Sequence, residues 1–174
     1  GWSGSITAQA WHLPAGEAKA QASLTYGGYT SLVYATGILG GMIADRYLGY
    51  QRSIILGGLL MAVGCFMLLS PEIHLFLIGL AVIVAGNGLF KPNISTMVGK
   101  LYAPGDVRRD SGFTIFYMGI NAGAFVAPLI TAVWIGANYG YKYGFLAAAI
   151  GMIFGIAVFQ VRKGMLGHVG KSPA

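Results

Sequence analysis

The stretch GLAVIVAGNGLFKPNISTMVG, residues 79–99, holds a single lysine, Lys91, in a run that is otherwise apolar, small or uncharged. An apolar run of about 20 residues is typical of a helix that crosses a bilayer. A charge at bilayer depth costs from about 2.5 to well over 10 kcal/mol and usually marks a pathway or a relay. Lys91 lies nine residues before Lys100. That is about 13 Å along a helix, farther than the lysine side chain reaches.

Two interpretations of Lys91 follow. The lysine is paired for structure at a helix–helix contact, or it binds substrate or couples protons in a polar cavity, and the energetic cost favours the second. Asn87 lies one turn before Lys91 on the same face of the predicted helix, and we expect Asn87 and Pro92 to have a gating or structural role. Pro92 follows Lys91 directly and removes a backbone donor, which favours a kink at this point.

The composition of the whole chain agrees with a membrane protein. The 174 residues are 56% hydrophobic and only 9% charged, and the mean hydropathy is +0.68. A soluble domain carries about 25% charged residues. The single cysteine, Cys65, excludes an intramolecular disulfide, and no metal-ligand cluster is present in the sequence.

The hydropathy pattern predicts an all-α bundle with five transmembrane helices in one domain. Residues 1–22 are mixed in character and are expected to form an extracytoplasmic loop or interfacial segment, and residues 162–174 a cytoplasmic tail. The transmembrane bundle is expected over 23–161, with spans at about 23–44, 53–70, 75–98, 113–135 and 142–161.

Basic residues in the short loops predict the orientation of the bundle. Two of them, Lys19 and Lys142, fall on one side. The other side is expected to be cytoplasmic, and it carries eight: Arg46, Arg52, Lys100, Arg108, Arg109, Arg162, Lys163 and Lys171. The net charge of +6 is thereby explained without a nucleic-acid partner.

Other polar residues in the spans have two possible roles. Asn121, one turn from Tyr117, is either a hydrogen-bonding residue between helices or a ligand contact. Tyr34 lies mid-span, about 11 residues before Asp45, which favours a cavity over the interfacial aromatic belt.

Small residues spaced four apart predict close helix packing. They occur as the pairs Gly37/Gly41, Gly119/Gly123 and Gly151/Gly155.

A short loop after the first span carries Asp45, Arg46 and Arg52. Asp45 is expected to cap the following turn or to pair with an arginine of the loop or of a neighbouring helix. Such pairs hold one conformation of a rocking bundle. Within the spans there is no Ser–His–Asp set, paired-carboxylate site or phosphate-binding loop, so we do not expect an enzyme.

Three segments resemble the proton-dependent oligopeptide transporters (the POT or PTR family), a branch of the major facilitator superfamily. Residues 40–49, GGMIADRYLG, resemble the first family signature, although a related Asp–Arg turn occurs across the superfamily. Residues 113–125, FTIFYMGINAGAF, resemble the more specific second signature. Residues 86–95, GNGLFKPNIS, are similar to the family's fourth helix, including its lysine.

The resemblance implies a role for each matching residue. Lys91 would face the central cavity and take part in peptide carboxylate recognition and proton coupling. Asn121 would contact the peptide backbone, and Tyr34 would line the same site. Asp45, with Arg46 and Arg52, would form the cytoplasmic turn that helps to gate alternating access.

Several family features are missing. The first-helix run E-x-x-E-R-F-x-Y-Y, which supplies coupling glutamates and a binding arginine, does not occur. Gly27 stands where some animal members have a histidine, and Gly37 replaces a common proline. The second six-helix bundle is also absent. The chain therefore resembles helices two to six of the N-terminal six-helix bundle of a larger transporter.

The implied function of the parent protein is symport of protons with di- and tripeptides across the cytoplasmic membrane, without a cofactor other than the coupling proton. Its partners would be small peptides, the lipid bilayer, the missing first helix and the C-terminal bundle. A bacterial inner membrane is the expected location. Two alternatives stay open: another major facilitator symporter, for nitrate, sugar or amino acids, and an inactive truncated membrane bundle.

Overall fold

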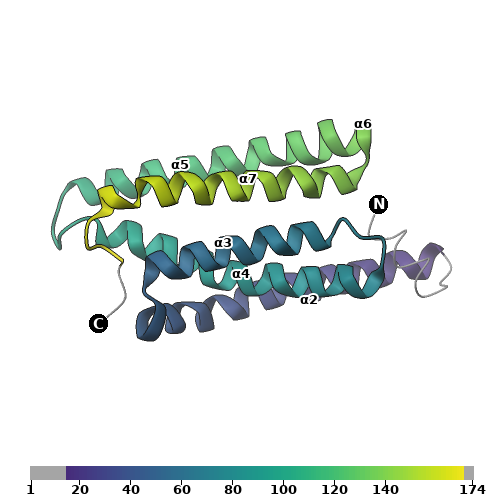
Figure 1. Ribbon diagram of the computed structural model, residues 1–174, viewed down its shortest axis with the longest axis horizontal. Helices are drawn as coiled ribbons and strands as arrows, with labels where there is room; N and C mark the ends of the chain where they lie inside the picture. The colour runs from purple at the N-terminus through teal and green to yellow at the C-terminus, as the bar shows by residue number, and fades with distance from the viewer. Residues whose placement is uncertain (1–14, 171–174) are drawn as a thin grey trace.

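A computed structural model describes residues 15–170 of the chain (Figure 1). Residues 1–14 of the predicted first segment and residues 171–174 of the predicted tail, including Lys171, lie outside the described part. Within 15–170 the chain contains helices and no strands, which agrees with the predicted all-α class. The α-helices are α2 (Ala15–Ile43), α3 (Tyr50–Met67), α4 (Ile73–Lys100), α5 (Arg108–Pro128), α6 (Ala137–Tyr139) and α7 (Tyr141–Arg162).

Three shorter helical segments extend these elements. The π-helical segment η1 (Ala44–Leu48) follows α2, and η3 (Lys163–Leu166) is a 3₁₀ turn after α7. The π-helical segment η2 (Leu129–Gly136) begins directly after Pro128, whose missing N–H loosens the hydrogen-bond ladder at that point. As a result α5, η2 and α6 form one helical run over Arg108–Tyr139, longer than the predicted span 113–135.

The first helix begins earlier than the sequence pattern predicted. Residues 15–22, expected in a loop or interfacial segment, form the first two turns of α2. The reason is local: AGEAKAQA consists mostly of strong helix formers, and Glu17 lies in the first turn, where a negative charge stabilises the helix dipole.

Four of the five long helices are long and apolar enough to cross a membrane. They correspond to the predicted second to fifth spans. The first predicted span, in α2, falls short because it is rich in Ser, Thr, Tyr and Gly. The serine and threonine hydroxyl groups of this span are nevertheless satisfied inside the helix; Thr25, Thr30 and Ser31, for example, each donate to the carbonyl oxygen four residues earlier. Internal bonding of this kind lowers the cost of placing such groups in lipid.

Close packing between α3 and α4 depends on glycines spaced seven residues apart on each helix. A Cβ atom on Gly57 would lie 2.6 Å from the carbonyl oxygen of Gly86, and one on Gly64 would lie 2.8 Å from that of Gly79. Only glycine allows the two backbones to approach this closely, as is common for helices in membranes.

The bundle has two layers. Helices α2, α3 and α4 form one layer, and α7 lies against α3 and pairs with the α5–η2 run to form the other (Figure 1). Within residues 15–170, no residue of α5 is buried. This long helix therefore presents almost its whole surface outward.

The predicted four-residue glycine pairs do not form the packing seams of this chain. A Cβ atom would meet nothing within 4 Å at Gly37, Gly41, Gly119, Gly123, Gly151 and Gly155. Sequence spacing identifies a stripe of small residues, but the position of the neighbouring helix decides whether the stripe is covered.

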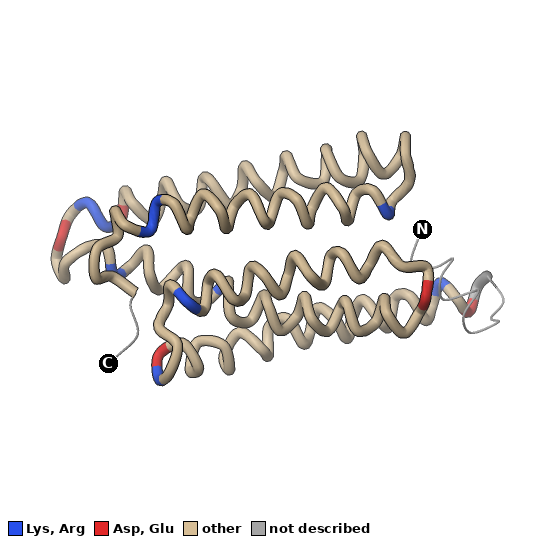
Figure 2. Tube along the Cα trace, viewed as in Figure 1, with Lys and Arg blue, Asp and Glu red and all other residues tan. Residues whose placement is uncertain are grey.

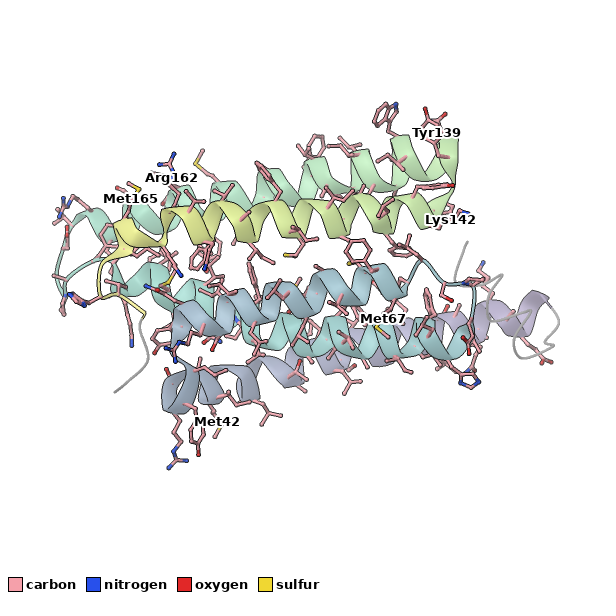
Figure 3. The ribbon with its side chains drawn as sticks, viewed as in Figure 1. Met42, Met67, Tyr139, Lys142, Arg162 and Met165 are labelled. Atoms are coloured by element: carbon pink, nitrogen blue, oxygen red, sulfur yellow. The ribbon has the colours of Figure 1, made fainter. Side chains whose placement is uncertain are left out.

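Most basic residues lie at one end of the bundle (Figure 2). The turn η1, the start of α3, the end of α4, the start of α5 and the end of α7 meet there because consecutive helices run in opposite directions. Lys142 and Arg162 mark the opposite ends of α7 (Figure 3). The predicted charge asymmetry between the two ends is thus present in the fold.

Candidate functional site

Lys91 lies on α4 with its side chain exposed rather than packed between helices. Its Nζ atom is 5.5 Å from the centre of the Tyr34 ring on α2. The Tyr34 side chain is itself 69% exposed. At this distance the ammonium group is attracted to the face of the ring. The structure therefore brings together two of the three predicted substrate-binding residues, on a surface that no other described helix covers.

The residues after Lys91 fix the crossing of α4 and α2. Pro92 has no N–H and leaves the carbonyl oxygen of Gly88 without its usual helix donor. That oxygen lies against Gly40 of α2, where a Cβ atom would clash with it. In return, a Cβ atom on Gly88 would lie 2.7 Å from the carbonyl oxygen of Thr36. The contact between α2 and α4 is thus a backbone-to-backbone contact directly beside Lys91.

Asn93 joins the same two helices and was not singled out as a site residue from the sequence. It is buried, with 1% of its surface exposed. Its Nδ2 donates to the carbonyl oxygens of Gly40, at 3.2 Å, and of Leu89, at 2.7 Å. The available signal was a second asparagine close to the lysine in an apolar run. Asn93 therefore positions Lys91 by holding α4 against α2.

Asn87 has a different environment from Asn93. It is half-buried between Gly86, which packs on α3, and Gly88, which packs on α2. Its side chain makes no hydrogen bond within residues 15–170. The expected structural role of Asn87 stays a prediction.

Asn121, the third predicted binding residue, lies on the exposed helix α5. The Tyr117 ring, one turn earlier, stacks on Phe113 at 6.4 Å and meets Phe116 edge-on at 5.7 Å. In the part of the chain that the structure describes, no hydrogen bond joins Asn121 to Lys91 or Tyr34. Its role in the same site stays a prediction.

The turn at Asp45 is held by a tyrosine and not by an arginine. The hydroxyl group of Tyr50 donates to Asp45 Oδ1. Lys100 Nζ, at the end of α4, in turn donates to the Tyr50 hydroxyl oxygen at 2.8 Å. Within residues 15–170 Asp45 forms no ion pair with Arg46 or Arg52, and no side chain caps the start of η1 or α3, so both expected contacts of Asp45 are wrong for this structure. Tyr50 is better placed because it begins α3, five residues after Asp45.

A second carboxylate at this end lies two residues before the start of α5. Asp106 Oδ1 accepts a hydrogen bond from the backbone N–H of Arg108 at 2.9 Å, and Asp106 Oδ2 forms an ion pair with Arg108 Nη2 at 2.9 Å. The side-chain hydrogen bonds from Arg108 hold the pKa of Asp106 below its usual value. The pair fixes the start of α5 at the basic end of the bundle.

Lys91 places a positive charge at the middle depth of the described bundle. The described acidic residues all lie near helix ends or in turns: Glu17, Asp45, Glu72, Asp106 and Asp110. An uncompensated ammonium group on an exposed face is suited to bind a carboxylate that arrives from outside this chain. It is equally suited to pair with an acid supplied by another segment.

The sequence matches the POT family over residues 51–173. The di-/tripeptide transporter of Lactococcus lactis subsp. lactis is 46% identical over 160 residues, which are 90% of this chain and 32% of that protein. The peptide transporter YePEPT of Yersinia enterocolitica is 43% identical over 145 residues, 82% of this chain and 28% of that protein. The chain thus spans about a third of the length of these relatives.

Solved structures show the same arrangement of helices. A peptide transporter POT in complex with sulfate is 41% identical and superposes with a TM-score of 0.82 over 98% of this chain and 36% of its own. A POT family transporter in complex with 5-aminolevulinic acid is 39% identical, with a TM-score of 0.78 over 83% of this chain and 30% of its own. The fold is accordingly that of the corresponding part of a major facilitator transporter, and the chain belongs to the POT family, whose members are transporters and not enzymes.

Proposed function

We propose that the whole protein is a proton-coupled symporter of di- and tripeptides in a bacterial cytoplasmic membrane. The observation that carries the proposal is the exposed ammonium group of Lys91 beside the Tyr34 ring, about 13 Å from the nearer end of α4. The names of the Lactococcus and Yersinia relatives support peptides as the substrate class.

The chemistry of a peptide fits these groups. A free peptide carries a carboxylate at one end and an ammonium group at the other. Lys91 offers a cation for the carboxylate, and Asn121 offers both a donor and an acceptor for the peptide backbone. Acidic groups for the amino end would come from segments outside this chain, such as the first helix and the C-terminal bundle of the parent transporter.

We further propose that Lys91 takes part in proton coupling. An ammonium group that alternates between a substrate carboxylate and a nearby acid changes how readily that acid keeps its proton. The turn with Asp45, Arg46 and Arg52 would help to gate access from the basic end, which is cytoplasmic by the positive-inside rule.

The test uses the full-length protein that contains this segment, reconstituted in liposomes with an imposed pH gradient. Lys91→Gln keeps a polar side chain of similar length but removes the charge, and we expect at least a tenfold loss of dipeptide accumulation. Lys91→Arg restores charge but replaces a compact ammonium with a planar fork, so we expect incomplete rescue.

Lys142→Gln is the matched control, because Lys142 is an exposed lysine at the opposite end of the bundle from the basic cluster. Dipeptide accumulation by this variant should stay within about twofold of the parent, since an exposed surface charge contributes little, even one that lies 5.0 Å from the centre of the Tyr143 ring. If Lys91→Gln accumulates dipeptide at the parent rate while folding normally, Lys91 is a structural residue and the proposed role is wrong.

A further inference from the structure

The segment after α7 folds back onto the start of α3. The backbone N–H of Gln51 donates to the carbonyl oxygen of Gly170 at 2.8 Å, and Gln51 Nε2 donates to that of Val169 at 2.6 Å. Gly170 has a φ of 79°, which glycine adopts without strain. These two bonds fasten the segment to the first turn of α3.

A cleft of about 650 Å³ lies between this segment and α3. Its lining includes three basic side chains, Arg52, Lys163 and His168, and no acidic one. In the described part of the chain no ion pair neutralises Arg52 or Lys163. The cleft therefore concentrates positive charge at the level where α3 begins and α7 ends.

An apolar groove of about 460 Å³ adjoins the cleft, and Ile55 lines both. Phe90 of α4 and Met152, Gly155 and Phe159 of α7 also line the groove. A Cβ atom on Gly155 would meet nothing within 4 Å, so the small residues of α7 leave space here. The groove extends along α7 from Arg162 to Gly151, about 16 Å along the helix axis.

We propose that the cleft and the groove together bind an anionic phospholipid. The phosphate would lie among Arg52, Lys163 and His168, because guanidinium and ammonium groups donate several charge-assisted hydrogen bonds to phosphate oxygens. One acyl chain would lie in the groove lined by Phe90 and Gly155. A basic cleft at the ends of membrane helices that continues into an apolar groove matches a molecule with a charged head and an apolar tail.

Native mass spectrometry of the full-length protein in detergent tests this proposal with phosphatidylglycerol as the probe. The double variant Arg52→Gln/Lys163→Gln should bind phosphatidylglycerol at least tenfold more weakly. His168→Gln, a change on the segment after α7, should weaken binding by a smaller factor. Gly155→Leu fills the groove and should also weaken binding of the lipid, but it should leave binding of inorganic phosphate unchanged.

The matched controls are Lys142→Gln for charge and Gly123→Leu for an exposed glycine on another helix. Both should bind phosphatidylglycerol like the parent. Equal binding by the parent and the double variant overturns the proposal. If inorganic phosphate displaces phosphatidylglycerol and Gly155→Leu does not change lipid binding, the cleft binds a free phosphate group. That result would overturn the lipid assignment. A large fall in melting temperature for Gly155→Leu without a change in lipid binding would mean that protein fills the groove, which also overturns it.

Discussion

The side-chain amide of Asn93 on α4 donates a hydrogen bond to the backbone carbonyl oxygen of Gly40 on α2, over 3.2 Å. Both groups are buried, and the bond lies two residues from Lys91 in the sequence. The orientation of the Lys91 ammonium group depends on how α4 crosses α2. This bond and the neighbouring glycine contact set that crossing.

Replacement of Asn93 should therefore destabilise the bundle. Asn93→Leu keeps the branched shape of the side chain, removes the donor to the buried Gly40 carbonyl oxygen and adds apolar volume at a buried position. Together these changes should cost about 1–3 kcal/mol. Thermal unfolding of the full-length protein in detergent measures the change. Thr96→Ala is the control, because Thr96 is exposed and its hydroxyl bonds only within α4. Equal melting temperatures for both variants would contradict the assigned role of Asn93.

Two glycines of α2 should differ sharply in their tolerance of alanine. Gly40→Ala places a Cβ atom against the Gly88 carbonyl and should cost about 1–3 kcal/mol, because two backbones must separate. Gly37→Ala meets nothing within 4 Å and should change stability little, or raise it through helix propensity. Unfolding of the two variants in parallel checks the contrast, and a larger loss for Gly37→Ala would refute it.

Substitutions at Tyr34 should separate the roles of its ring and its hydroxyl group. Tyr34→Phe keeps the face that Lys91 lies over, so the dipeptide affinity of the full-length protein should stay within about twofold. Tyr34→Leu removes the aromatic face and should weaken affinity by about 2- to 30-fold, the equivalent of a cation–π contact of about 0.5–2 kcal/mol. If Tyr34→Phe weakens dipeptide binding as much as Tyr34→Leu does, the hydroxyl group of Tyr34, and not its ring, is the important contact.

Tyr50→Phe should loosen the turn between α2 and α3. The change removes the donor to Asp45 and the acceptor for Lys100, but keeps the ring over Lys100 Nζ. We expect a loss of about 0.5–1.5 kcal/mol, the net contribution of a typical hydrogen bond, because both bonds of this hydroxyl group are exposed to solvent screening. Arg46→Gln serves as the control. Because Arg46 is exposed, its replacement should lower the free energy of unfolding by less than about 0.5 kcal/mol. The melting temperatures of the two variants decide the point, and a smaller loss for Tyr50→Phe than for Arg46→Gln would show that the hydroxyl group does not hold this turn.

The orientation of the bundle in the membrane has a direct test. Cysteines introduced at Arg108 and Arg109 should react with an impermeant reagent only after the membrane is permeabilised, because the basic end is expected to be cytoplasmic. A cysteine at Lys142, at the other end, should react in intact cells. The reverse labelling pattern would overturn the orientation.

Much of the fold follows from the sequence alone. Long apolar runs, the scarcity of charge and the alternation of basic and nearly uncharged loops predict an all-α membrane bundle. They do so because a bilayer accepts only segments that satisfy their backbone internally. The energetic cost of a charge at bilayer depth likewise identifies Lys91 as a candidate site residue from the sequence. Apolar runs do not predict the start of α2, because AGEAKAQA contains Glu17, Lys19 and Gln21 and its helix comes from helix propensity rather than from hydropathy.

Only the tertiary structure decided which residues of each helix meet. The pairs Gly37/Gly41 and Gly57/Gly64 are equally visible in the sequence, yet a backbone lies against the second pair alone. Asn87 and Asn93 both flank Lys91, but only Asn93 faces the Gly40 carbonyl. Sequence spacing determines which side chains share a face of one helix. The rotation and crossing of the neighbouring helix, set by contacts from distant parts of the chain, determine whether that face is covered.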